Sequence, residues 1–415
     1  MKLSLRMIQQ LSGIALLVVL GIFIEHRFSV ADRWLTANSS RLGSTNNAEL
    51  VNTTVPAERK EVDFSTFWEV WSILERDYIK PEQVVTAKMV DGAIAGMTAS
   101  LDDPYTMYLP PVENERSGQD LAGAFFGVGI ELGFKDQILA VISPLPDTPA
   151  AVAGVEAGDL IIKVTDKEKG IDEDTAGWSI EKAVEAIRGP RGSTVVLTLV
   201  REGKSEPFTV SLQRGEIVVK SAELEFVEHA GKRVAHIKLS RFGERTDTEW
   251  DSLVNTILKE KGSIAGVVLD MRNNPGGFFD GAIKVASEFI DDETVVIQKG
   301  KYAEQDFSSR GSARLRNIPI EVLVNKGSAS ASEIVAGALR DQLGAKLVGE
   351  KTFGKGTVQD RRELSNGGGI HVTVAQWMLP KGEWIHETGI PVDVEVSDDR
   401  ETEADEQLLK AIEVL

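Results

Sequence analysis

The apolar positions between residues 63 and 117 follow a helical period. Those at the start recur at i, i+3, i+4 and i+7, which predicts an amphipathic helix; they are Phe64, Phe67, Trp68, Trp71, Leu74 and Tyr78. A second helix with one apolar face is predicted over roughly residues 87–100. The prolines of "DDPYTMYLPP" end it, because proline cannot continue a helix. We therefore take residues 63–117 as an N-terminal helical region.

The pattern changes to alternation in residues 118–213. Apolar and polar residues alternate in "STVVLTLV" and "PFTVSL", which predicts a pair of half-buried strands. The segment "AFFGVGIEL" opens the block, and "ILAVIS" is predicted to be a further short strand. One amphipathic helix is predicted at "SIEKAVEAIRG", with Ser179 as its N-cap. A block of this size and content is typical of a small, mainly β module.

From residue 214 to 400, continuous apolar strands alternate with amphipathic helices. "AGVVLDMR" and "PIEVLVN" are predicted to be buried strands, and residues 247–262 and 278–290 are predicted helices. Such alternation predicts an α/β core whose sheet is covered on both faces. Residues 401–415 are predicted to form a helix that docks on the body or on a second subunit, through Leu408, Leu409, Ile412 and Leu415.

The first 30 residues differ from the rest. Lys2 and Arg6 precede the uncharged apolar run from Leu11 to Ile24, a pattern typical of an export signal. We favour an uncleaved signal anchor over a cleaved signal peptide, followed by a flexible polar linker at residues 31–62. Because positive residues stay in the cytoplasm, the remaining chain is expected on the outer side of the membrane.

Charge and cysteine content narrow the classes of function. The 415-residue chain has a formal net charge of -18, which argues against a nucleic-acid partner because phosphate repels such a surface. It has no cysteine, which excludes disulfides, thiolate nucleophiles and cysteine-based zinc sites. We expect neither a metal nor another cofactor.

The segment "NKGSASASEIVAGAL" carries three serines on alternate residues, Ser328, Ser330 and Ser332. It lies between a predicted buried strand and a predicted helix, so the serines are expected at the N-terminal end of that helix. Backbone N–H groups there are unpaired and the helix dipole is positive, which suits stabilisation of an oxyanion. On this segment alone, a helix cap formed by Ser328 or Ser330 is the better interpretation.

A nucleophilic serine usually has a histidine as its base, but none of the five histidines lies in a recognisable catalytic setting. A lysine is the candidate base instead. "KTFGKGTVQ" places Lys355 between Gly354 and Gly356, after another predicted buried strand. Lysine can act as a general base when desolvation lowers its pKa, and Ser–Lys pairs are a known variant of nucleophilic hydrolysis. A phosphate-binding loop is the alternative, but the segment lacks the full Walker spacing. The Pro-Gly-Gly turn in "DMRNNPGGFF" could supply a second oxyanion donor.

Together these segments resemble the carboxyl-terminal processing proteases, also called tail-specific proteases. "GSASASEIVAGAL", "VGEKTFGKGTVQ", "LDMRNNPGG" and "GMTASLDDPYTMYLPP" occur in that family's order, and "FFGVGIEL" with "AGVEAGDLI" resembles an inserted PDZ module. The resemblance covers about residues 64–400. It implies a crotonase/ClpP-like α/β protease core at residues 214–400, with a mainly β PDZ domain at residues 118–213 inserted after the helical region.

The resemblance assigns roles residue by residue. It implies Ser330 as the nucleophile, Lys355 as its base and Gln359 as the residue that orients the lysine. The oxyanion donors would be the amide of Ala331 and one amide of the Pro-Gly-Gly turn, with Gly276 favoured over Gly277. Asp341 is also acidic in the family, but eleven residues along a helix span about 16 Å. We therefore predict that Asp341 is structural and pairs with Arg340, Lys346 or a neighbouring loop.

The predicted PDZ domain has a binding function of its own. Successive amides around Gly127, Val128 and Gly129 could form a nest for a terminal carboxylate. Ile130 would begin the strand against which a peptide adds, and the helix "SIEKAVEAI" would form the other wall of the groove. We take Phe126 to Ile130 as the peptide-binding loop.

The leading interpretation is a serine endopeptidase of the bacterial cell envelope, facing the periplasm or the exterior. It would cleave unfolded or tagged polypeptides selected by their free C-termini. A homo-oligomer and a regulatory adaptor are further possible partners. The alternative is a catalytically silent PDZ scaffold. A penicillin-recognising acyltransferase is excluded, because Glu333 stands where that class places its lysine.

Overall fold

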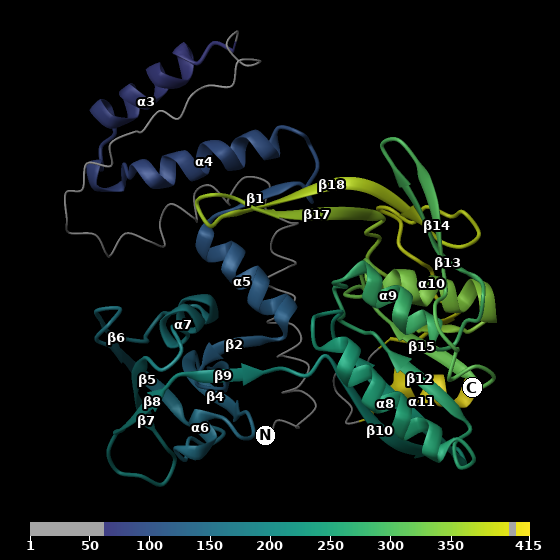
Figure 1. Ribbon diagram of the computed structural model, residues 1–415. Helices are drawn as coiled ribbons and strands as arrows, with labels where there is room; N and C mark the ends of the chain where they lie inside the picture. The colour runs from purple at the N-terminus through teal and green to yellow at the C-terminus, as the bar shows by residue number, and fades with distance from the viewer. Residues whose placement is uncertain (1–61, 398–403) are drawn as a thin grey trace. The chain divides into compact units, whose positions relative to one another are not determined.

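The computed structural model describes residues 62–397 and 404–415 (Figure 1). The predicted signal anchor or signal peptide (1–30) and all but the last residue of the predicted linker (31–62) lie outside these ranges. The described residues fall into two compact units, one of residues 115–358 and 374–415, the other of residues up to 114 and 359–373. In the part of the chain that the structure describes, no helix combines the length and apolarity needed to cross a membrane.

The smaller unit contains the two helices predicted from the helical period. Helix α3 covers Ser65–Asp77 and α4 covers Thr86–Ala99, joined through the short 3-10 helix η2 at Pro81–Gln83. Only Trp71 of α3 is buried, so most of the predicted apolar face is exposed. Strand β1, Met107–Leu109, was not predicted; it pairs antiparallel with the first residues of β18, Gly369–Met378.

The predicted mainly β module is present, with its own core. Its antiparallel sheet has the order β3-β4-β5-β7-β8, and β6 pairs with β5. The predicted helix is α7, Ile180–Ile187, and the Ser179 hydroxyl accepts a hydrogen bond from the N–H of Lys182, as expected of an N-cap. The other elements are β3 (Ile130–Lys135), β4 (Ile138–Pro144), α6 (Pro149–Val152), β5 (Leu160–Asp166), β6 (Ile171–Asp174), β7 (Thr194–Val200) and β8 (Phe208–Gln213).

A two-stranded ribbon links this module to the rest of the chain at both of its ends. Strand β2, Ala124–Gly127, pairs antiparallel with β9, Gly215–Val218. Before the ribbon lies a helix that was not predicted, α5, Pro111–Ala122, which crosses the expected boundary at residue 117. The two prolines had indicated a break, but Pro111 occupies the first turn of α5, where a missing N–H costs nothing.

The expected α/β core is built on a six-stranded sheet of order β10-β11-β12-β15-β16-β19. Within this sheet, the five strands β11, β12, β15, β16 and β19 run parallel to one another, and the edge strand β10 runs antiparallel to β11. The strands are β10 (Ala222–His229), β11 (Lys232–Leu239), β12 (Gly266–Asp270), β15 (Ile320–Val324), β16 (Leu347–Gly349) and β19 (Val394–Glu395). The helices are α8 (Thr246–Glu260), α9 (Phe279–Ser287), α10 (Ala331–Leu343) and α11 (Glu406–Val414).

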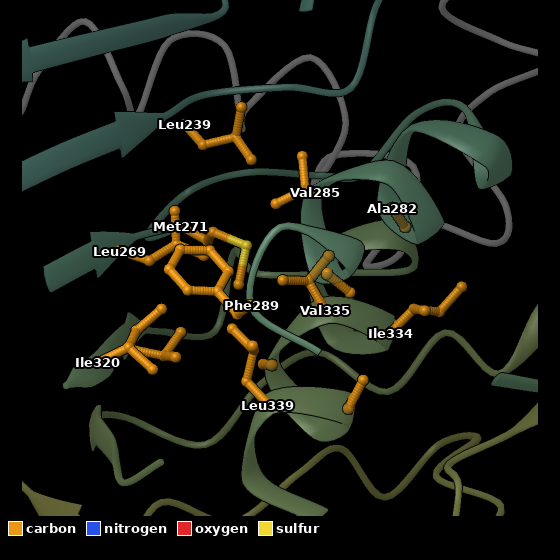
Figure 2. Packing of buried hydrophobic residues seen from close by; sticks show 14 of the residues in the cluster. Leu239, Leu269, Met271, Ala282, Val285, Phe289, Ile320, Ile334, Val335 and Leu339 are labelled. Atoms are coloured by element: carbon orange, nitrogen blue, oxygen red, sulfur yellow. The ribbon is translucent and has the colours of Figure 1, made fainter. Parts of the chain in front are cut away.

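Hydrophobic residues cover both faces of this sheet, as the sequence predicts. On one face, Leu269 and Met271 pack with Phe289 of the segment after α9 and with Val335 and Leu339 of α10 (Figure 2). On the other face, α11 buries side chains against alternate positions of the central strands; the cluster comprises Val234, Val268, Leu323, Val348, Leu408, Ala411 and Ile412. Full burial of such side chains contributes about 1.5–3 kcal/mol each. The C-terminal helix therefore docks on the body of the chain, one of the two expected outcomes.

A second antiparallel sheet was not predicted. In the larger unit, β13 (Thr294–Gly300) pairs with β14 (Glu304–Ser308) and with the last residues of β18. Strand β17, Thr357–Glu363, is the partner of β18. These strands carry many polar side chains and little strict alternation, so the hydrophobic pattern gave no signal for them.

Candidate active site

Ser330 lies at the turn between β15 and α10, immediately before the first residue of the helix. Its backbone is in an unusual conformation, with φ 55° and ψ -114°, which non-glycine residues rarely adopt. Such strain concentrates at functional positions and is held there by the surrounding structure. Ser330 is partly exposed, in contrast to the two other serines of the segment, which are fully buried.

The outer serines tie the nucleophile turn to the loop after β12. The Ser328 hydroxyl donates to the carbonyl oxygen of Met271 at 2.8 Å, and the Ser332 hydroxyl donates to that of Asn274 at 2.9 Å. The N–H of Ala329 also donates to the carbonyl of Asn274, at 3.0 Å. The capping role considered for Ser328 is therefore wrong, since its hydroxyl bonds to a different segment, whereas Ser330, the other serine considered, is the N-cap of α10.

Glu333 joins the segments of the predicted nucleophile and base. Its Oε2 accepts hydrogen bonds from the N–H of Ser330 at 2.8 Å and from the N–H of Lys355 at 2.9 Å. The two backbone nitrogens are therefore no farther apart than the sum of these distances. Its Oε1 accepts from the Thr352 hydroxyl and the Gly354 N–H, both at 2.6 Å. One buried carboxylate thus organises both halves of the candidate site.

The surroundings of the Glu333 side chain shift its pKa. The side chain is fully buried, and this burial raises its pKa above the ordinary value, while its four hydrogen-bond donors partly oppose the rise. The sequence analysis gave Glu333 no role. The spacing Ser330-x-x-Glu333 matches a capping box, so a signal for its contact with the N–H of Ser330 was present.

Lys355 lies in the loop between β16 and β17, two residues before β17 begins. Its carbonyl accepts a hydrogen bond from the Trp377 indole at 2.9 Å, which fixes the backbone on the side away from Glu333. Gly354 has φ 94°, and a Cβ there would lie 2.7 Å from the backbone nitrogen of Gly389. Glycine at this position therefore allows the Gly-Lys-Gly segment to approach another backbone closely.

The Pro-Gly-Gly turn comes within contact distance of the nucleophile. A Cβ at Gly276 would lie 2.9 Å from Ser330 Cβ and 3.0 Å from the nitrogen of Ala331, so glycine is required. The Gly276 N–H is already donated to the Asn274 side chain at 2.9 Å. Within residues 62–397 and 404–415, the N–H groups of Gly277 and Ala331 have no hydrogen-bond acceptor. The amide of Gly276 is thus occupied in the structure, and the oxyanion donor of this turn stays a prediction.

Gln359 and Asp341, also named from the sequence, have the following contacts. Gln359 is on β17 in the smaller unit, where its Nε2 donates to the Thr373 hydroxyl at 3.0 Å. Its role in orienting Lys355 stays a prediction. Asp341, on α10, is paired with Arg340 at 3.2 Å and accepts from the N–H of Lys381 at 3.3 Å. The expected pairing of Asp341 with Arg340 and a neighbouring loop is confirmed.

The predicted peptide-binding loop, Phe126 to Ile130, contains two successive amides with no acceptor among the described residues. The carbonyl of Val128 accepts from Ala150, and that of Gly129 accepts from Leu145, both at 2.9 Å. The N–H groups of Val128 and Gly129 have no acceptor among the described residues. Gly129 has φ 75°. A short run of free amides around a left-handed glycine can bind an anion.

Ile130 begins β3, which is an edge strand with β4 as its neighbour in the sheet. Its other edge can pair with an added peptide strand. Helix α7 contacts β3, as expected of the second wall of the groove. In the described part of the chain, no group of three or more His, Cys, Asp or Glu side chains is placed to hold a metal ion.

Family models match three parts of the chain. Residues 233–396 match peptidase family S41, residues 25–111 match the N-terminal domain of activating protease CtpB, and residues 141–201 match the PDZ domain. The carboxy-terminal processing protease CtpA of Bacillus subtilis is 34% identical over 358 residues, covering 86% of this chain and 72% of the relative. The chain belongs to the carboxy-terminal processing protease family of S41 peptidases.

One more curated relative and two solved structures are similar to this chain. A probable CtpA-like serine protease of Staphylococcus haemolyticus is 36% identical over 343 residues, which cover 82% of this chain. The chain spans 66% of that relative's length. The solved putative S41 protease from Bacteroides fragilis is 18% identical, with a TM-score of 0.54 and coverage of 83% of this chain and 95% of that one, which shows a shared fold. The photosystem II D1 C-terminal processing protease is 29% identical, with a TM-score of 0.48, covering 86% of this chain and 97% of that one.

Proposed function

We propose that the chain is a serine endopeptidase in which Ser330 is the nucleophile, Lys355 the general base and Gln359 the residue that orients the lysine. The observation that carries the proposal is the Glu333 carboxylate, because its Oε2 accepts from the backbone N–H of both Ser330 and Lys355. A serine and a lysine held on adjacent backbones, without a catalytic histidine, match the Ser–Lys variant of acyl transfer.

The chemistry follows from these positions. Neutral Lys355 accepts the proton of the Ser330 hydroxyl as the serine oxygen attacks the peptide carbonyl. The negative oxygen that forms is stabilised by the free N–H groups of Ala331 and Gly277 at the positive end of α10. Lys355 then gives its proton to the leaving amine, and water, deprotonated by the same lysine, hydrolyses the acyl-enzyme.

Substrate selection is assigned to the PDZ domain. The free amides of Val128 and Gly129 would bind a terminal carboxylate, and the open edge of β3 would pair with the residues before it. Peptide recognition by Phe126 to Ile130 therefore selects polypeptides by their free C-termini, and unfolded or tagged proteins supply such tails in extended form.

Exposed aromatic side chains adjoin the loops of the active site. Phe278 follows Gly277 and is 40% exposed, Phe353 lies two residues before Lys355 and is 37% exposed, and the 44% exposed Trp384 donates to the carbonyl of Gly356 at 3.0 Å. Exposed apolar groups beside a reactive serine favour contact with a polypeptide substrate over a small polar one.

We further propose that the N-terminal segment anchors the protein in the bacterial envelope, with the protease facing the periplasm or exterior. The crotonase/ClpP-like class of the core also remains a proposal. A catalytically silent PDZ scaffold is the alternative function. The complete set of Ser330, Lys355 and Gln359 speaks against it.

The test compares the native protein with Ser330→Ala on an unfolded polypeptide and on two lengths of synthetic peptide. The native protein should cleave and Ser330→Ala should not, while both give the same circular dichroism spectrum. Amidating the substrate C-terminus should lower kcat/KM for long substrates more than for short ones, because short peptides reach Ser330 without capture. Equal turnover by Ser330→Ala would refute the nucleophile. No effect of amidation on long substrates would refute tail recognition.

A further inference from the structure

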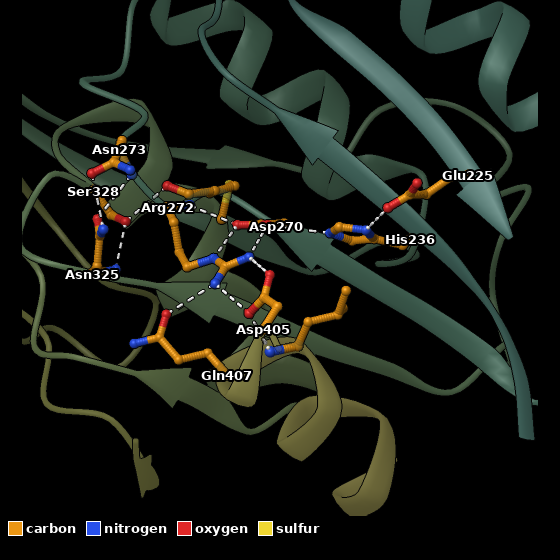
Figure 3. A network of polar contacts seen from close by, with 11 residues as sticks. Glu225, His236, Asp270, Arg272, Asn273, Asn325, Ser328, Asp405 and Gln407 are labelled. Carbon is orange, nitrogen blue, oxygen red and sulfur yellow. Dashed lines mark hydrogen bonds and ion pairs between the residues drawn. The ribbon is translucent and has the colours of Figure 1, made fainter. Parts of the chain in front are cut away.

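A network of charged side chains leads to Arg272, which lies in the loop that carries the Pro-Gly-Gly turn (Figure 3). His236 on β11 contacts Glu225 through Nδ1 at 2.8 Å and Asp270 through Nε2 at 3.2 Å. Asp270 ends β12 and is paired with Arg272 at 2.6 Å. Arg272 is in turn paired with Asp405 at 2.8 Å, so the network of charged side chains extends from the edge strand β10 to the start of the C-terminal helix α11.

Arg272 makes the largest number of hydrogen bonds in this network. Its guanidinium donates to both carboxylate oxygens of Asp270, to both of Asp405 and to Oε1 of Gln407, at distances of 2.6 to 3.0 Å. Its side chain is 16% exposed. Burial favours the neutral forms, but the mutual charges and hydrogen bonds win, so the pKa of Asp270 lies well below its usual range and that of Arg272 above it. Both groups are charged in the folded protein.

Asp405 and Gln407, the partners of Arg272 at the C-terminal helix, are themselves held by hydrogen bonds. Asp405 is the N-cap of α11, and its Oδ1 also accepts from the N–H of Leu408 at 2.9 Å. Gln407 is buried and donates from Nε2 to the carbonyl of Val396 at 2.7 Å. The apolar face of α11 is buried against the sheet. The two groups that hold Arg272 from this side therefore belong to a helix that is packed on the sheet.

Successive hydrogen bonds connect the residue after Arg272 to the turn that carries Ser330. The N–H of Asn273 donates to the Asn325 side chain at 2.8 Å, and the Asn325 amide donates back to the Asn273 side chain at 2.9 Å. The N–H of Asn325 donates to the Ser328 hydroxyl, also at 2.9 Å. The same loop continues to Gly276 and Gly277. A displacement at Arg272 would therefore move both the Pro-Gly-Gly turn and the nucleophile turn.

We propose that Asp405 and Gln407 are positioning residues for catalysis, which act through Arg272 on the oxyanion loop, residues 271–277. The C-terminal helix is then a part of the active-site framework. This inference rests on the proposed peptidase function. Because the oxyanion forms only after attack, misplacement of its donors should lower kcat and leave KM nearly unchanged.

The variant that tests it is Asp405→Asn. Asparagine is as good an N-cap as aspartate, so α11 should keep its start, while the charge that faces Arg272 is lost. The matched control is Glu413→Gln, which neutralises an exposed carboxylate on the same helix. Asp405→Glu restores the charge and should recover part of the activity. Gln407→Met, which removes another acceptor of Arg272, should change kcat in the same direction by a smaller factor.

We expect Asp405→Asn to lower kcat about tenfold with less than a twofold change in KM, since displacements near 1 Å can cost up to about a hundredfold. Amide hydrogen exchange should quicken about tenfold in residues 271–277 and remain unchanged in α8. Glu413→Gln should match the native protein in both measurements. Native kcat or native exchange of the loop in both Asp405→Asn and Gln407→Met would overturn the inference.

The exchange measurement separates this inference from the proposed function, because it needs no turnover. Failure of the native protein to cleave any polypeptide would overturn the peptidase assignment, and exchange would still report whether Asp405 orders the loop. Native cleavage with unchanged exchange in the variants would overturn the positioning role alone.

Discussion

Glu321 lies on β15, the strand that leads into the nucleophile turn, and provides a pH-dependent test of the core. Its side chain is 8% exposed, and its carboxylate accepts the N–H of Lys346. Burial raises its pKa to about 7, and the nearby charge of Asp393 adds to the rise, while the Lys346 contacts oppose it. Glu321→Gln keeps the shape and an acceptor for the Lys346 N–H, but it cannot ionise.

The raised pKa fixes the sign and size of the effect. Between pH 4.5, the ordinary value, and about 7, the folded protein holds a proton that the unfolded chain releases. The stability from this group is therefore complete below pH 4.5 and is lost as the pH rises through 7. One pKa unit corresponds to about 1.4 kcal/mol, so the native protein loses up to about 3 kcal/mol by pH 8 and less than about 1 kcal/mol by pH 5.

The assay is thermal unfolding of native protein and Glu321→Gln between pH 5 and 8. The variant should be nearly as stable as the native protein at pH 5. At pH 8 its Tm should be about 5–10 °C higher, taking about 2–4 °C per kcal/mol for a domain of this size. Other titrating groups, His236 among them, act equally on both proteins and cancel in the difference. Glu223→Gln, on exposed β10, serves as control and should follow the native curve. An equal or lower Tm for Glu321→Gln at pH 8 would show that this reasoning is wrong.

Three further predictions concern activity. Lys355→Arg should lower kcat by at least about a hundredfold, since guanidinium stays charged and cannot accept the serine proton; near-native turnover would exclude Lys355 as the base. Ser332→Ala should reduce the free energy of unfolding by about 0.5–1.5 kcal/mol and lower kcat, because it removes one of the two hydrogen bonds that join the nucleophile turn to the carbonyl of Asn274; denaturant unfolding that matches the native protein would argue against this tie. Gly277→Ala should abolish activity, because its Cβ would lie 2.0 Å from the carbonyl oxygen of Phe242, whereas Gly311→Ala, also at positive φ but in open space, should retain it.

The parts of the fold that were predicted are those whose hydrophobic period is strong. The buried strands β12 and β15 and helices such as α10 show it over enough residues to decide between strand and helix. Strands β13, β14 and β17 carry mixed polar residues, and their pairing depends on partners distant in the sequence. Helix α5 was missed because Pro111 was taken as a terminator, although proline is equally suited to a first turn.

The candidate site was predicted in its residues more completely than in its geometry. The strand-to-helix turn and the Gly-Lys-Gly segment are visible locally, whereas the choice of Ser330 among the three serines, and of Lys355 as its base, rests on the family resemblance. The carboxylate of Glu333 that joins them could not be found in this way, since its contacts with Gly354 and Lys355 span more than twenty residues. The choice between Gly276 and Gly277 depends on which amide Asn274 occupies, and this is decided only by the folded loop.

The ribbon of β2 and β9 has a consequence for the order in which the chain folds. Pairing residues 124–127 with residues 215–218 closes a loop of nearly ninety residues, and the entropic cost of closure rises with the logarithm of loop length. In the folded PDZ module, Phe126 accepts from the N–H of Gly189 and Arg214 donates to the carbonyl of Ile187, so both ends are held beside the end of α7 and most of that cost has been met locally. During synthesis, residues 130–213 leave the ribosome before the sheet of the protease core is complete. The insertion can therefore act as a folded connector, which lets β2 and β9 pair as if they were joined by a short turn.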